Sequence, residues 1–242
     1  MTAKLYSLLV SHPSVAAHLM LERKRIDHRV RQIPPGLHPL VVRFAGFPGD
    51  TVPALVIDGR RIQGSTLISR ALDELVPEPP LFPADPDRRR AVEEAEAWGE
   101  SELQPVPRRM YRWGLVHSRD MRRRLADVSR MPAPGLVAAT NGPLARAFAD
   151  AIGADDEGVR LDLRELPGKL DRVDALIEDR VIGTDEPNAA DFQIATTVRV
   201  LMSFADLRDR IDGRPAGELA ERLVPAWPEE VPPFLPADWV RA

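Results

Sequence analysis

Hydroxyl side chains stand at two places where a short apolar run changes into a helical pattern. In "LYSLLVSHPSVAAHL", Ser11 and Ser14 follow the apolar run 5–10. In "QGSTLISRALDEL", Ser65 and Thr66 open a second helical pattern. A helix N-terminus with a hydroxyl donor stabilises an anion, and the same residue types also serve as ordinary helix caps. Each place is therefore either a capped turn or an anion site.

The amino-acid composition gives no support for cysteine chemistry, metal binding or a hydrolytic Ser-His pair. The chain has no cysteine, which excludes disulfides, thiolate zinc sites and a cysteine nucleophile. No histidine pair has the i, i+4 or HxH spacing of a metal site, so we expect no metal; the histidines are at positions 12, 18, 28, 38 and 117. His12 is next to Ser11, and adjacent residues on a helix do not face each other, so a Ser-His hydrolytic pair is not expected.

Length and charge limit the class of protein. The 242 residues are enough for one large domain or two small ones. The net charge of -4 gives no electrostatic reason to expect nucleic acid or anionic lipid as a partner. No run approaches the roughly 20 apolar residues of a membrane span, and no signal-peptide pattern opens the chain. We therefore expect a cytoplasmic protein that binds neither nucleic acid nor membrane.

Strand and helix patterns alternate in the first third of the chain and must position both hydroxyl clusters. A strand signal is followed by helical spacing, a weak strand and a Pro/Gly-rich connection, and then by a hairpin whose turn is Asp58-Gly59. The predicted elements are a strand at 5–10, a helix at 14–25, a strand at 28–33, a short helix within the Pro/Gly-rich connection, strands at 54–57 and 61–63, and a helix that Ser65 caps. This is a β-α-β-α-β-β-α order.

The rest of the chain reads as helical. The predicted helices are 87–98 with a continuation toward Trp113, 119–130, 143–152, 161–178, 189–207 and 216–224. Pro105 and Pro107 should break the first of them, and Pro167 should start or bend the fourth. The 24 prolines concentrate at 77–86 and 225–236, which predicts a linker and an irregular tail.

Together these features resemble the cytosolic glutathione S-transferase family. The resemblance rests on the hydroxyl at the first strand-helix junction, Val52-Pro53 before a strand in "TVPAL", the serine in "QGSTLISRALDE" and the helical second half. It implies an α/β plus all-α fold, with a thioredoxin-like N-terminal domain at 1–76, a Pro-rich linker at 77–85 and an all-helical C-terminal domain at 86–242. "PNAADFQIATTVRVLM" resembles the family's capping box, in which Asn188 and Asp191 would cap a buried helix.

The resemblance also implies roles for particular residues. Ser11 would donate a hydrogen bond to the sulfur of glutathione and lower the pKa of its thiol, while Ser14 would belong to helix packing. A cis Val52-Pro53 bond would turn the backbone of Val52 toward the cysteine moiety of glutathione. Ser65, with Thr66, would bind the γ-glutamyl carboxylate at a helix N-terminus.

One position departs from the family pattern. The residue before Ser65 is usually acidic and takes the γ-glutamyl ammonium, but this chain has Gly64, with Gln63 one position further back. An unpaired ammonium costs on the order of 1–3 kcal/mol. The glycine carboxylate of the tripeptide would meet Arg43 or His38.

The second substrate should bind between Ser11 and the helical half. Trp98, Tyr111, Arg112 and Trp113 are candidates for its lining, with ordinary packing as the alternative for each. Some classes of the family use a tyrosine near the N-terminus. Tyr6 is one residue away from that position, so its side chain should point to the other face of the strand.

The resemblance implies a glutathione transferase that joins glutathione to a small electrophile. The same activated thiolate would serve a peroxidase, an isomerase or a dehalogenase. Two alternatives remain open: a non-catalytic binding or assembly module with this fold, and an enzyme that uses another low-molecular-weight thiol. Members of the family are typically two-fold homodimers, so a homodimer is expected.

Overall fold

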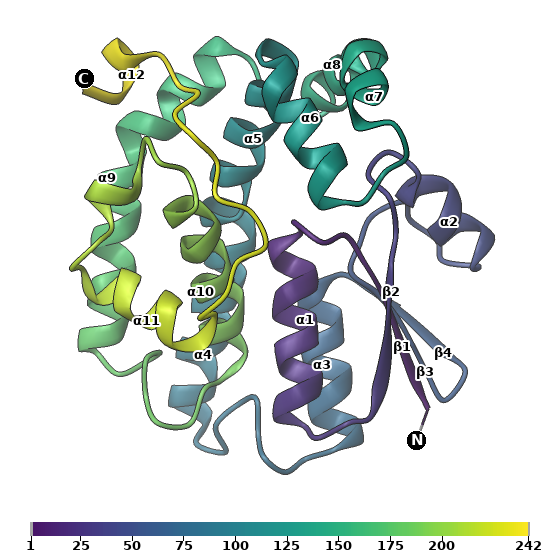
Figure 1. The fold of residues 1–242 in the computed structure, drawn as a ribbon. Coiled ribbons are helices and arrows are strands. Elements are labelled where there is room, and N and C mark those ends of the chain that lie inside the picture. Colours follow the sequence, from purple (N-terminus) through teal and green to yellow (C-terminus); the bar gives the residue numbers. More distant parts are fainter. Residues whose placement is uncertain (1, 242) are drawn as a thin grey trace.

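The computed structural model describes residues 2–241 and contains a small sheet beside a larger group of helices (Figure 1). The first part has the predicted β-α-β-α-β-β-α order. Its elements are β1 (Ala3–Ser7), α1 (His12–Arg23), β2 (His28–Gln32), α2 (His38–Phe44), β3 (Ala54–Ile57), β4 (Arg60–Gln63) and α3 (Ser65–Leu75). The expected thioredoxin-like arrangement of sheet and helices is confirmed.

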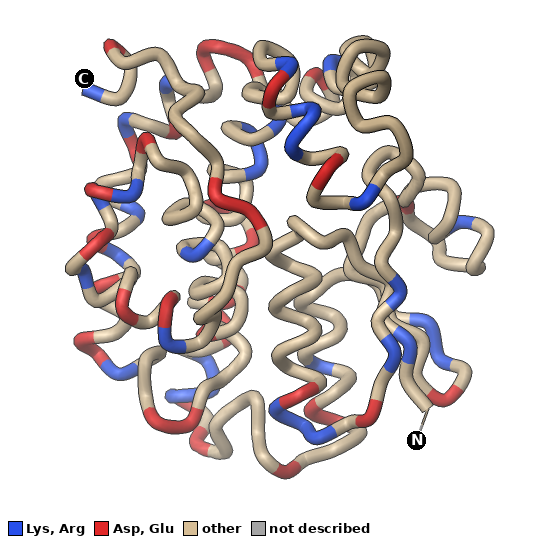
Figure 2. Tube along the Cα trace, viewed as in Figure 1, with Lys and Arg blue, Asp and Glu red and all other residues tan. Residues whose placement is uncertain are grey.

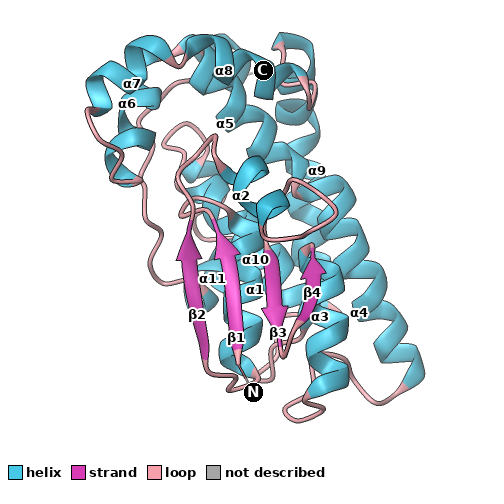
Figure 3. Cartoon of the chain, turned by 90° about the vertical axis from the view of Figure 1, so that its right-hand side faces the viewer, coloured by secondary structure: helices cyan, strands magenta, loops and turns pink. Residues whose placement is uncertain are grey.

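The four strands have the order β2-β1-β3-β4, with β1 parallel to β2 and antiparallel to β3, and with β3 antiparallel to β4. Helices α1 and α3 lie between the sheet and the helical part (Figures 1 and 3). Side chains alternate along β1, so Leu5 joins the core shared with those helices while Tyr6 points to the side of α2. Tyr6 packs there against Phe47, with ring centroids 5.7 Å apart.

The remaining helices form the second part and confirm the predicted, mostly helical architecture. They are α4 (Pro86–Trp98), a π-helical turn (Gly99–Leu103), α5 (Pro105–His117), α6 (Arg119–Val128), α7 (Pro134–Thr140), α8 (Gly142–Asp150), α9 (Asp156–Glu178), α10 (Ala189–Met202), a 3₁₀ turn (Arg208–Arg210), α11 (Pro215–Leu223) and α12 (Ala237–Arg241). Every residue of α10 is buried. Its apolar side chains join those of α1 in one continuous core, which connects the two parts.

The capping box of α10 is confirmed. Asn188 Oδ1 accepts from the N–H groups of Ala190 and Asp191 at 2.9 and 3.2 Å, and Asp191 Oδ2 accepts from the N–H of Asn188 at 2.9 Å. The other carboxylate oxygen of Asp191 accepts from the N–H of Gly183 at 2.6 Å. Burial raises the pKa of Asp191 to about 6, against the opposing effect of these backbone donors.

Several predicted boundaries are wrong. The first strand ends at Ser7 rather than at residue 10, because the chain turns there and the N–H of Ser11 donates to the carbonyl of Leu8 at 3.1 Å. Helix α1 then begins at His12, earlier than predicted. Helix α9 begins at Asp156, because Asp155 caps it by accepting from the N–H of Gly158, and it continues through Pro167.

The two Pro-rich segments are more ordered than predicted. No helix or strand covers 76–85, yet Leu81 is buried and its N–H donates to the Asp73 carboxylate at 2.7 Å. The tail runs back over the helical part, pairs Val231 with Phe204, and ends in α12, which the sequence did not predict (Figure 1). Helix α7 was not predicted either. The division of the chain at 76 and 86 stays a prediction.

Charged residues of both signs are interspersed along the chain, as on α9 and α11 (Figure 2). Among the described residues, every helix is too short or too polar to cross a membrane.

Candidate functional site

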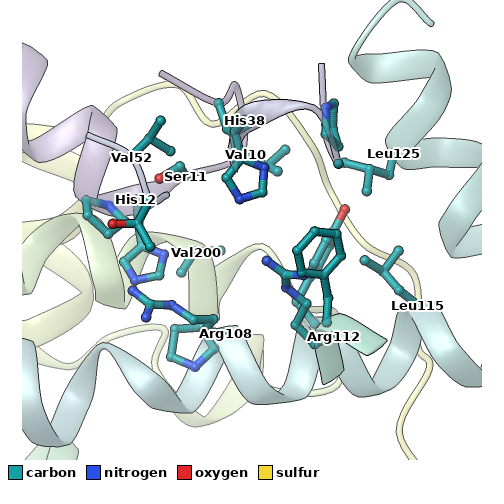
Figure 4. A pocket seen from close by; sticks show the side chains of 18 of the residues that line it. Val10, Ser11, His12, His38, Val52, Arg108, Arg112, Leu115, Leu125 and Val200 are labelled. Atoms are coloured by element: carbon teal, nitrogen blue, oxygen red, sulfur yellow. The ribbon is translucent and has the colours of Figure 1, made fainter. Parts of the chain in front are cut away.

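A cavity of about 520 Å³ lies where the two parts meet. Its walls come from the loop between β1 and α1, the Val52-Pro53 peptide and the starts of α2 and α3 on one side. The helices α5, α6 and α8, the end of α10 and the C-terminal tail close the other side (Figure 4). Most of the residues that the sequence singled out for chemistry are brought together here.

Ser11 lies at the cavity wall immediately before α1, where its main chain is extended. Its side chain does not cap the helix. Instead, the hydroxyl of Ser14, which is buried, donates to Ser11 Oγ at 3.0 Å. With this bond already accepted, the hydroxyl hydrogen of Ser11 is free to donate toward the cavity. Ser11 and Ser14, which are three positions apart in the sequence, thus form a hydroxyl pair.

His12 does not form a catalytic pair with Ser11. The ring is buried, and that burial, followed by the positive charge of Arg108, holds the pKa of His12 well below its usual range. The imidazole is therefore neutral. Its Nε2 atom has no hydrogen-bond partner within residues 2–241.

The Val52-Pro53 bond is cis, as predicted, and both residues line the cavity. Neither the N–H nor the C=O of Val52 bonds to another backbone group in the described chain. Gln63 is engaged elsewhere: its Oε1 accepts from the N–H of Gly49 at 2.8 Å and its Nε2 donates to the carbonyl of Thr51 at 2.7 Å. The Gln63 side chain thus braces the loop that leads to Val52.

The second hydroxyl cluster lies at the start of α3. Ser65 is buried and was predicted to cap this helix, but it is the first helical residue. The cap position is occupied by Gly64, whose φ is 96°. Both residues line the cavity. Thr66 Oγ1 donates to Glu100 Oε2 at 2.5 Å.

Glu100 was not singled out from the sequence. It belongs to the π-helical turn between α4 and α5 and lines the cavity beside Gly64 and Ser65. A carboxylate therefore stands at the start of α3 after all, although it comes from the helical part of the chain. The local signal was the proline pair Pro105 and Pro107, which lies just after this turn at the start of α5.

Two arginines on α5 face the cavity. Arg108 and Arg112 are four residues apart, so they share a face of the helix (Figure 4). Burial, followed by the charge of Arg108, lowers the pKa of Arg112 to about 10, so the guanidinium remains charged at neutral pH. It lies over the ring of Phe148 at 4.6 Å. Arg112 was a candidate from the sequence and Arg108 was not.

The two candidates for the glycine carboxylate are placed differently. His38 lines the cavity and stacks on Phe148, with ring centroids 5.7 Å apart. Burial, followed by the charge of Arg112, lowers the pKa of His38 to about 4, so this ring is neutral. Arg43 lies outside the cavity lining and reaches toward Asp50 at 3.5 Å.

The far end of the cavity joins α5 to the tail. The hydroxyl of Tyr111 donates to Glu229 Oε2 at 2.8 Å, and both residues line the cavity. Trp98 and Trp113, the other aromatic candidates, are buried and are not among the lining residues. Glu229 could not be assigned to the site from the sequence, because the tail had no recognisable pattern.

Comparison with known proteins supports this architecture. The family model for the glutathione S-transferase N-terminal domain matches residues 5–80. Curated protein sequences gave no match.

Solved structures match nearly the whole chain. A glutathione S-transferase from Rhodospirillum rubrum F11 has a TM-score of 0.64 at 19% identity, covering 98% of each chain. One from Methylobacterium radiotolerans JCM 2831, in complex with glutathione sulfonate, has a TM-score of 0.58 at 20% identity, covering 98% of this chain and 97% of the other. The β-etherase LigF from Sphingobium sp. strain SYK-6 has a TM-score of 0.62 at 20% identity, covering 92% of this chain and 100% of the other. Residues 5–80 thus form an N-terminal domain of the glutathione S-transferase family, and the chain as a whole has the glutathione S-transferase fold.

Proposed function

We propose that the protein binds glutathione and activates its thiol for attack on a small electrophile. The observation that carries this proposal is the hydroxyl pair at the start of α1, where Ser14 donates to Ser11 at 3.0 Å within the cavity wall. Accepting that bond polarises the Ser11 hydroxyl and makes it a better donor. The glutathione S-transferase fold and the glutathione sulfonate bound to one protein of that fold support the choice of thiol.

The residues around the cavity match the three parts of the tripeptide. Val52 offers a free backbone N–H and C=O to the cysteine moiety. Ser65 and the N-terminus of α3 offer donors to the γ-glutamyl carboxylate, while the Thr66 hydroxyl already donates to Glu100. Glu100 would accept from the γ-glutamyl ammonium, in place of the acidic residue that Gly64 replaces. The unpaired ammonium expected from the sequence then no longer arises.

The chemistry follows from the pKa of the thiol. A free thiol titrates near pH 8.5, so only a few per cent is ionised at pH 7. The Ser11 hydroxyl and the positive end of the α1 dipole stabilise the thiolate, whose proton goes to solvent. The sulfur then forms a bond to the electrophilic atom of the second substrate, and the electron pair moves to a leaving group or an adjacent acceptor atom.

The experiment is an ultraviolet titration of the thiolate of bound glutathione in the wild type, Ser11→Ala and Ser14→Ala. We expect a depressed thiol pKa in the wild type and a rise of about one unit in Ser11→Ala, since about 1.4 kcal/mol corresponds to one unit. Ser14→Ala should raise it by less, because the donor to the thiolate stays. Ser129→Ala, outside the cavity, is the matched control.

The rivals predict different results. Failure to bind millimolar glutathione would favour another low-molecular-weight thiol or a non-catalytic module. A depressed thiol pKa that neither variant moves would assign the effect to the helix end alone.

We also propose that the protein forms a two-fold homodimer and is located in the cytoplasm. The dimer is supported by the outer face of α2, where Leu40 and Phe44 are 58% and 90% exposed. Light scattering of the wild type and Phe44→Ser would test it: the variant should shift toward the monomer mass.

A further inference from the structure

Arg108 and Arg112 both line the cavity, and Arg108 is exposed while Arg112 is half-buried. In the described part of the chain, neither forms an ion pair, whereas the neighbouring Arg109 binds the Asp162 carboxylate. Arg108 donates to the side-chain oxygen of Gln104 and is close enough to Glu100 to be attracted by its charge, while the guanidinium of Arg112 lies over the ring of Phe148. Like charges four residues apart on a helix repel each other. The fold thus keeps two guanidinium groups together without neutralising them.

The other charged groups of the cavity are already engaged. Arg122 donates to the carbonyls of Leu115, Val116 and Ala138 at 2.6 to 3.1 Å. Glu229 accepts from Tyr111, Glu100 from Thr66, and Asp50 reaches toward Arg43. In the described part of the chain, the carboxylates that line the cavity therefore form no ion pair with either arginine.

The arginines lie between the hydroxyl pair and an apolar region. Figure 4 shows Arg108 and Arg112 extending from one helix toward the loop with Ser11 and His12. On the other side of Arg112, Leu115 and Leu125 line the cavity and Phe148 covers the guanidinium. A ligand that reaches both regions needs an anionic group and an apolar body.

We propose that the second substrate is an organic acid, with a carboxylate bound by Arg108 and Arg112 and an apolar body packed toward Leu115 and Leu125. The identification of this ligand as the electrophilic substrate rests on the proposed function, but the anion site itself does not depend on it. Guanidinium groups pair with carboxylates through parallel hydrogen bonds, and in a partly closed cavity such bonds are stronger than in water. The selectivity for the acid over a neutral analogue is the consequence to measure.

The test uses 4-phenylbutanoate and 4-phenylbutanamide, which share an apolar body and differ in charge. Isothermal titration calorimetry would compare their dissociation constants in the wild type, Arg112→Gln and Arg112→Lys. We expect the wild type to prefer the acid by about 10-fold or more, as a charge-assisted hydrogen bond provides. Arg112→Gln should lose most of this preference and Arg112→Lys should keep part of it, because the charge remains.

The controls separate this inference from the proposed function. Arg146→Gln makes the same change of charge on an exposed part of α8, outside the cavity lining, and should leave the preference unchanged. Arg108→Gln provides the second variant if Arg112→Gln does not fold. Glutathione affinity is measured on each protein without the acid.

Equal affinity of the wild type for the acid and the amide overturns the inference, whether or not glutathione binds. A loss of glutathione affinity in Arg112→Gln also overturns it, because the arginines would then hold a carboxylate of the tripeptide. Retained acid preference with no glutathione binding would support the anion site and refute the proposed function instead.

Discussion

Replacing Glu100 by glutamine tests the carboxylate that the helical part contributes to the start of α3. Glutamine keeps the length of the side chain and a carbonyl oxygen that can accept from the Thr66 hydroxyl, which bonds Glu100 at 2.5 Å in the structure. The change therefore removes the negative charge and leaves the local packing in place. Under the proposed function, the variant loses the acceptor for the γ-glutamyl ammonium.

The size of the effect follows from the surroundings of Glu100. A hydrogen bond to a charged group contributes about 1.5–3 kcal/mol to binding, but Glu100 is exposed, so water and salt screen the interaction. Because of this screening we take a value below that range, about 1–1.4 kcal/mol, which corresponds to a loss of about 5- to 10-fold in glutathione affinity. The loss should shrink as the salt concentration rises.

The assay compares glutathione with glutaryl-cysteinylglycine, which lacks the γ-glutamyl amino group. Calorimetry should find that the wild type binds glutathione about 5- to 10-fold more tightly than the analogue and that Glu100→Gln binds the two about equally. Glu102→Gln is the matched control, because Glu102 lies on the same π-helical turn and reaches Lys169 at 3.8 Å, away from the cavity. If Glu100→Gln weakened both ligands by the same factor, the carboxylate would not act on the ammonium and the reasoning would be refuted.

Two further predictions concern stability. Asp191→Ala leaves the buried N–H groups of Asn188 and Gly183 without acceptors, which destabilises the fold. It also removes a carboxylate whose burial raises its pKa to about 6, which partly offsets that effect. We expect the free energy of unfolding to fall by about 2 kcal/mol and Tm by about 4–8 °C. Calorimetric unfolding would measure this, and an unchanged Tm would contradict the role of the cap. His38 has a folded pKa of about 4, so between about pH 6.5 and 4 the unfolded state binds a proton that the folded state does not, and stability falls as the pH falls. When the pH falls from 7 to 5, the free energy of unfolding measured in urea should fall by about 1–2 kcal/mol less for His38→Gln than for the wild type. An equal fall in both proteins would contradict the neutral ring of His38.

Local patterns predicted the elements whose causes are local. The capping box of α10 depends on Asn188 and Asp191, three residues apart, and its resemblance to the family's capping box predicted it. The strand-helix alternation of the first part was predicted from the spacing of apolar residues. The boundaries were less accurate: the end of β1 depends on a turn at Leu8 that apolar residues 8–10 concealed.

The contacts that complete the cavity join distant parts of the chain. Thr66 and Glu100 are 34 positions apart, and Tyr111 and Glu229 are 118 apart. No periodicity or motif records such a pair, because each side chain alone is an ordinary polar residue on a helix or in a tail. The tail in particular appeared irregular, yet it supplies Glu229 to the cavity.

Gly64 shows why a missing motif residue is weak grounds for a lost function. A Cβ atom at this position would meet no atom within 4 Å, so space does not require glycine. The backbone conformation does favour it, since φ is 96° and side chains rarely adopt that region. The fold therefore gains an unstrained start to α3 with glycine, and it places Glu100 at the same helix end from the other part of the chain. If Glu100 binds the ammonium as proposed, the carboxylate for this contact comes from the helical part and not from the position before Ser65. This substitution of one carboxylate for another is visible only in a structure that contains both parts of the chain.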